Sequence, residues 1–165
     1  MEGAFRALPV VSLQYLEGDM FGINGIYDNP DDTGDASERN VHIEYFDPDD
    51  PEETFHIAGG MRIHGGNGRR HAKKSIRLYF RAEYGLNRLD YDFYPDSPVK
   101  SFKRLLLRAG VHDAWTFTRN WAEASFMRNE FLHALQIAMD QPSPRGKLVH
   151  VYLNGAYWGF YAIQE

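Results

Sequence analysis

Apolar and polar residues alternate along several short segments of this chain. Strict alternation is the pattern of a strand that buries one face and exposes the other. In segment 75–80, for example, Ile76, Leu78 and Phe80 occupy every second position. The pair Gly59-Gly60 indicates a bulge within another such segment, 55–64. The pattern predicts strands at 8–13, 41–46, 55–64, 75–80, 148–153 and 156–163, with a brief buried run at 105–107.

The period changes between residues 122 and 139, where apolar residues recur at helical spacing. Pro142 and Pro144 follow, and they end the helix because proline cannot extend it. Residues 17–39 are rich in Gly, Asp and Asn and are expected to form a long loop. The apolar face of the predicted helix contains Ala124, Met127, Phe131, Leu135 and Ala138.

A hairpin is predicted after this helix, because Asn154-Gly155 separates two alternating segments and both residues tolerate positive φ. The order along the chain is therefore several strands, one helix and a hairpin. This order predicts an α+β fold, in which one main helix packs on an antiparallel sheet. The length of 165 residues fits a single domain that spans 1–165.

The composition is that of a globular protein, with 43% hydrophobic and 25% charged residues. The net charge of −5 argues against nucleic-acid binding, which requires a basic surface. No apolar run reaches the roughly 18 residues of a membrane helix, and residues 1–11 lack the apolar core of a signal peptide. The chain has no cysteine, and its seven histidines lack the His-x-x-x-His spacing of a helical zinc site, so no metal site is predicted.

The strongest chemical candidate lies between two predicted strands, in segment 62–80. Its glycines, Gly65, Gly66 and Gly68, allow the backbone to curl and to direct N–H groups at one point. The basic residues beside that point are Arg69, Arg70, Lys73 and Lys74. On an acidic protein this concentration of charge indicates a specific anion, most simply a phosphate. The alternative is a solvated basic turn, with Lys74 as a charge that protects an edge strand.

Five segments, taken together, resemble the CotH spore-coat protein kinase family, and the resemblance extends from about Leu8 to the last residue. They are GMRIHGGNGR (60–69), KKSIRLYF (73–80), LLLRAG (105–110), MRNEF (127–131) and VYLNGAYWGFYAIQE (151–165). The resemblance implies a fold like the small lobe of an atypical protein kinase. It also implies transfer of phosphate from ATP, with Mg²⁺, to serine or threonine of a protein, and a location outside the cell or on a cell or spore surface.

The resemblance assigns roles to positions in this sequence. The glycine turn would cover the nucleotide phosphates, and Lys74 rather than Lys73 would contact the α- and β-phosphates. Glu130 on the predicted helix would orient that lysine; the alternative is a surface carboxylate paired with a neighbouring base. Glu165 would lie at the end of the strand that leads to the adenine-holding hinge. The residues that would contact the nucleotide are Gly65, Gly66, Asn67, Gly68, Arg69, Arg70, Lys73, Lys74 and Glu165.

The chain ends where the large lobe of such a kinase would begin. The aspartates that bind Mg²⁺ and act as the base are therefore expected downstream, and efficient catalysis is not expected from this polypeptide alone. The expected partners are that downstream lobe and a protein substrate or coat protein. The alternatives are a non-enzymatic surface, adhesion or spore-coat-like binding module and a carbohydrate-binding β-domain. Two positions stay open: Asn129, where similar sequences often carry Asp, and Arg108, which is either a buried charge partner or a surface residue.

Overall fold

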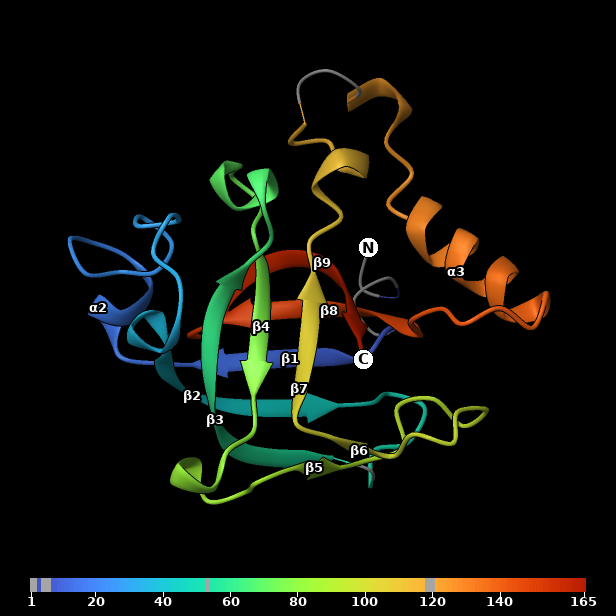
Figure 1. Cartoon of the computed structure of the whole chain (residues 1–165), viewed down its shortest axis with the longest axis horizontal. Coiled ribbons are helices and arrows are strands. Elements are labelled where there is room, and N and C mark those ends of the chain that lie inside the picture. The colour runs from blue at the N-terminus through green and yellow to red at the C-terminus, as the bar shows by residue number, and fades with distance from the viewer. Residues whose placement is uncertain (1–2, 4–6, 53, 118–120) are drawn as a thin grey trace.

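Seven strands close into a barrel in the computed structural model (Figure 1). The structure describes residues 3, 7–52, 54–117 and 121–165. The barrel strands are β1 (Val10–Gln14), β2 (Arg39–Phe46), β3 (Phe55–His64), β4 (Ser75–Tyr79), β7 (Arg104–Arg108), β8 (Gly146–Leu153) and β9 (Ala156–Gln164). The remaining elements are α2 (Glu17–Met20), β5 (Leu89–Asp90), β6 (Ser101–Phe102) and α3 (Arg128–Ala138), with β5 and β6 forming a separate two-stranded sheet.

The barrel order is β1-β2-β3-β4-β7-β9-β8, and β8 returns to β1. Neighbouring strands run antiparallel except at the closure, where β1 and β8 are parallel and Val11 lies opposite Val151. Closure removes the exposed edges that an open sheet would present, because every barrel strand pairs with a neighbour on each side.

Alternation along the strands sends every second side chain into the barrel. Leu13, Met61 and Leu107 are fully buried there, whereas the arginines of β7 point outward because they alternate with buried leucines. The predicted strands therefore agree with the observed ones to within two residues at most ends. The sharp turn at Asn154-Gly155 is confirmed, with φ of 47° and 83°.

The predicted α+β fold is wrong: the protein is mostly β, and its sheet closes on itself instead of lying under a helix. α3 begins at Arg128 rather than at 122 and contains no buried residue. Phe131 and Leu132 are 67% and 53% exposed, and Figure 1 shows α3 projecting beside the barrel. Helical spacing predicted a helix here, but Ala124 and Met127 of its expected apolar face precede α3, and spacing does not determine what covers such a face.

Two smaller predictions also differ from the structure. The pairing of β2 with β3 runs without interruption through Gly59 and Gly60, so no bulge occurs there. The long loop predicted at 17–39 contains the short helix α2 and one 3-10 turn. Among the described residues, no helix combines the length and apolar character needed to cross a bilayer.

Candidate functional site

The glycine-rich segment connects β3 to β4 and lies at the same end of these strands as the turn that follows β7 (Figure 1). Gly65 has φ of +119°, a conformation that side chains rarely adopt, so a glycine is required where the chain leaves β3. Residues Asn67–Arg70 then form one 3-10 turn. The segment is therefore a compact turn placed over the end of the barrel wall.

A pocket of about 440 Å³ lies against this turn. One side is formed by four of the nine residues predicted to contact the nucleotide, Gly65, Gly66, Asn67 and Gly68. The opposite side comes from the end of β7 and the first turn of α3, and contains Arg108, Gly110, His112, Asp113, Arg128 and Asn129. Three segments that are distant in the sequence thus surround one cavity.

Two contacts hold the second side of the pocket in place. The N–H of Ala109 donates to Ser75 Oγ at 2.9 Å, which ties the end of β7 to the start of β4. The buried carboxylate of Asp113 accepts the backbone N–H groups of Ser125 at 2.9 Å and Arg128 at 3.1 Å. Burial alone would raise the pKa of Asp113, but these hydrogen bonds outweigh it and hold the pKa below its usual value. Asp113 therefore anchors the start of α3 beside the pocket.

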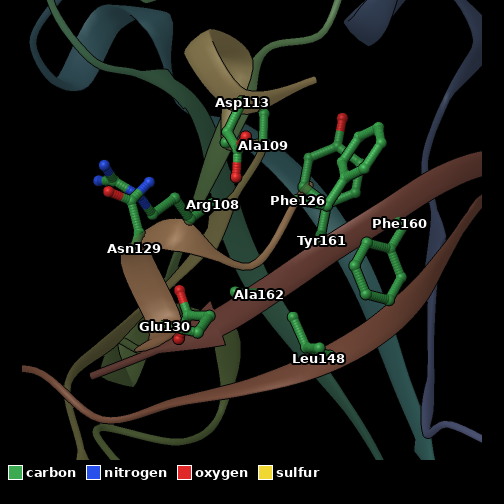
Figure 2. Close-up of a pocket in the computed structure, with 11 residues that line it drawn as sticks. Arg108, Ala109, Asp113, Phe126, Asn129, Glu130, Leu148, Phe160, Tyr161 and Ala162 are labelled. Atoms are coloured by element: carbon green, nitrogen blue, oxygen red, sulfur yellow. The ribbon is translucent and has the colours of Figure 1, made fainter. Parts of the chain in front are cut away.

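A second, narrow pocket lies between α3, β7, β8 and β9 and shares lining residues with the first (Figure 2). Arg108 and Asp113 line both pockets, and Glu130 lines the narrow one. The Glu130 carboxylate accepts a hydrogen bond from Gln164 Nε2 at 2.7 Å. It also lies against Gly146, where a Cβ atom would stand 1.9 Å from Glu130 Oε2, so a side chain at that position would force the Glu130 carboxylate to move.

Lys73 lies in a different, aromatic environment. Its ammonium donates to the carbonyl oxygen of Phe160 and lies 4.7 Å from the ring centre of Tyr161 and 5.1 Å from that of Phe126. Burial lowers the pKa of Lys73 to about 8. Lys73 lines a second cavity of about 440 Å³, which is mainly apolar and includes Trp158.

Lys74 is buried, with 5% of its surface exposed. Its ammonium donates to the carbonyl oxygen of Arg69 at 2.5 Å and lies 4.6 Å from the ring centre of Tyr27. Burial lowers the pKa of this lysine as well. In the described part of the chain neither Lys73 nor Lys74 forms an ion pair with Glu130.

The other predicted residues also have partners within the protein. The guanidinium of Arg69 donates to the carbonyl oxygen of Ile63 at 2.7 Å. Arg70 pairs with Asp31 at 2.9 Å on the surface. The Glu165 carboxylate accepts the backbone N–H of Arg145 at 3.2 Å. The structure therefore brings the glycine turn and Glu130 to adjoining pockets, whereas Arg69, Arg70, Lys73, Lys74 and Glu165 line neither of these two.

A comparison with protein families finds a match between residues 61–165 and the family described as CotH kinase protein. The chain belongs to the CotH kinase family. The matched segment begins four residues before Gly65 and contains every residue of both pockets, so the site lies wholly within the part that CotH kinases share. A comparison with curated proteins finds no match.

Sequence reasoning left Arg108 undecided and did not single out Arg128, the two arginines that line the pocket of this CotH kinase family member. His64 accepts a hydrogen bond from Arg77 at 2.9 Å, and its pKa is lowered to about 4 by burial and then by the charges of Arg77, Arg69 and Arg108. The available signal was the pattern of β7, where Arg104 and Arg108 flank a buried apolar run and must point out of the barrel.

Proposed function

We propose that this chain is the ATP-binding part of a CotH-type protein kinase that transfers phosphate to serine or threonine of a protein. Membership of the CotH kinase family indicates a kinase-like function. ATP as the donor and a surface or coat protein as the acceptor are the proposed details. The observation that supports them best is the pocket beside the turn Gly65–Gly68, which combines a curled backbone with surrounding positive charge.

The residues of this pocket fit a chain of phosphates. Phosphate oxygens are held in proteins by backbone N–H groups of glycine-rich turns and by arginine side chains. The turn supplies the first kind of group, and Arg108 and Arg128 supply the second. ATP bound here would supply the phosphoryl group, and the residues of the chain would bind and orient its phosphates.

A metal ion is part of the proposal, because Mg²⁺ accompanies ATP in phosphoryl transfer. Within residues 3, 7–52, 54–117 and 121–165, no three His, Asp or Glu side chains are grouped so that they could hold a metal ion. We propose that Mg²⁺ is bound by the phosphates of ATP and by carboxylates outside this chain.

The test is a calorimetric titration of the protein with Mg-ATP, using variants that place a negative charge at or away from the turn. A Cβ atom at Gly66 would meet no atom within 4 Å, so Gly66→Glu adds charge without a clash. We expect this variant to lose Mg-ATP binding while its thermal unfolding stays close to that of the wild type.

The matched control is Gly18→Glu, which also has open space at its Cβ but lies in α2, remote from the turn in sequence. This variant should bind Mg-ATP as the wild type does. If the folded wild type shows no binding at millimolar Mg-ATP, the proposal fails, and the non-enzymatic binding module becomes the better account of this family member.

A further inference from the structure

Arg108 occupies the point at which the two pockets of the site meet. It is the last residue of β7, and it points out of the barrel because Leu105 and Leu107 point in. It lines the pocket beside the glycine turn and also the narrow pocket that contains Glu130, the second of which is drawn in Figure 2. Among the basic residues that line the first pocket, Arg108 is the one that also reaches the second.

The charge of Arg108 has no carboxylate partner among the described residues. Its Nε atom is buried and has no hydrogen-bond partner there. The two carboxylates that line the same pockets are already engaged, since Asp113 binds Ser125 and Arg128, and Glu130 accepts from Gln164. A buried N–H donor without an acceptor is costly and calls for an explanation. The Nε atoms of Arg69 and Arg81 share this state, but Arg108 is the one of the three that lines the two pockets.

The two lysines of segment 65–74 are in the opposite situation. Lys73 and Lys74 each donate to a backbone carbonyl oxygen, and each lies over aromatic rings. Either ammonium would have to give up these contacts to reach the pocket beside the turn. Their ammonium groups are therefore already bound within the protein, while the guanidinium group of Arg108 is available to a ligand.

The surroundings of His64, which also lines the pocket, are basic, and together with burial they lower its pKa to about 4. After burial, the causes of this lowered pKa are the neighbouring charges of Arg77, Arg69, Arg108 and Arg104, so the mouth of the pocket carries an excess of positive charge. An anion bound there would be attracted by several guanidinium groups at once.

We propose that the Arg108 side chain binds the nucleotide phosphates, together with the backbone of the glycine turn, and that Lys73 and Lys74 do not. This assignment rests on the proposed function, and it names the cation that acts at that site. The ligand class is a di- or triphosphate, whose oxygens supply the acceptor that the Arg108 guanidinium lacks.

The test compares Arg108→Gln with Arg104→Gln by calorimetric titration with Mg-ATP and with inorganic tripolyphosphate. Arg104 is a matched control because it lies on the same outward face of β7 but is exposed and lines neither pocket. Because Arg108 is expected to form a charge-assisted hydrogen bond to phosphate, Arg108→Gln should lower the affinity for both ligands about 10- to 100-fold. Arg104→Gln should change these two affinities less than about threefold. Arg108→Lys should recover part of the affinity that Arg108→Gln loses.

Chemical labelling of the wild type tests the same assignment without any variant, and so remains decisive if Arg108→Gln does not fold. Mg-ATP should protect Arg108, but not Arg104, from modification by phenylglyoxal. Equal affinities in the two Gln variants, or labelling of Arg108 that Mg-ATP does not change, would overturn the assignment while leaving the proposed function intact. A wild type that binds neither ligand would instead overturn the proposed function itself.

Discussion

Two positively charged regions flank the glycine turn, and they differ in how their charge is used. On one side, Lys73 and Lys74 point inward and bind backbone carbonyl oxygens. On the other, Arg108 faces a cavity and has a buried N–H without a partner in the described part of the chain. The lysines adjoin the glycines in sequence, whereas Arg108 comes from a different strand. Proximity in sequence therefore does not show which charge a ligand can reach.

The lysines join the turn to the rest of the barrel. Lys73 contacts the backbone of β9 at Phe160, and the hydroxyl of Tyr161 in turn donates to the carbonyl oxygen of Lys74 at 3.1 Å. These contacts fix the segment 65–74 against β9, which is the second strand of the hairpin. On one side of the turn the lysines are held by the protein, whereas on the other side the Arg108 Nε has no partner in the described part of the chain. We therefore expect an anion to bind on the arginine side.

The largest expected effect comes from Asp113→Ala, which removes the anchor of the arginine side. A buried carboxylate that accepts several hydrogen bonds is lost, so we expect the free energy of unfolding to fall by about 2–4 kcal/mol. Chemical denaturation measures the loss, and hydrogen exchange should show that α3 is affected more than β3 and β4. A loss below about 0.5 kcal/mol would show that Asp113 does not hold α3 in place.

The next effect is expected for Lys74→Met, which tests the lysine side. Methionine retains most of the side-chain volume but leaves the carbonyl oxygen of Arg69 without its donor, so stability should fall by about 1–2 kcal/mol. Lys103→Met is the matched control, because Lys103 is exposed. Equal unfolding midpoints for the two variants would mean that the buried contact of Lys74 does not stabilise the fold.

A smaller, pH-dependent effect is expected at Lys73. Its pKa of about 8 in the folded protein is below the usual value of about 10.4 for an unfolded chain. Between these pH values the unfolded chain binds more protons, so stability should rise as the pH increases. The free energy of unfolding of the wild type should therefore gain on the order of 1 kcal/mol relative to Lys73→Met between pH 7 and 9.5. If the free energies of unfolding of the wild type and of Lys73→Met changed in parallel with pH, the lowered pKa of Lys73 would be contradicted.

The smallest effect is expected for Arg70→Ala. Arg70 and Asp31 are both largely exposed, and water and salt screen such a pair. The unfolding temperature should not change measurably, at low or at high ionic strength. A clear loss of stability would show that the surface pair, rather than the buried lysines, holds the turn.

The strands and the final hairpin were predictable because they depend on local patterns. The alternation around Leu78 gives the direction of each side chain, and Asn154-Gly155 gives the turn. Closure of the barrel was not predictable in this way, since the pairing of β1 with β8 joins Val11 to Val151 across most of the chain. The exposure of Phe131 was missed for a related reason, because a helical pattern contains no information about neighbours.

The candidate site was predictable only in part. Gly65, Gly66 and Gly68 share a motif and were found from it, and the structure places them at a cavity. Their role in binding phosphate, and that of Glu130 beside them, stay predictions. Arg108 was left undecided because its availability depends on the acids around it, and those come from α3 and from the turn after β7.

The most direct measurement is a crystal structure of the protein with Mg²⁺ and a non-hydrolysable ATP analogue. Our account predicts phosphate oxygens within hydrogen-bonding distance of the backbone N–H groups of Gly66–Gly68 and of the guanidinium of Arg108, with Lys73 and Lys74 still bound to Phe160 and Arg69. Phosphates bound instead by either lysine, with Arg108 turned to a protein carboxylate, would contradict it.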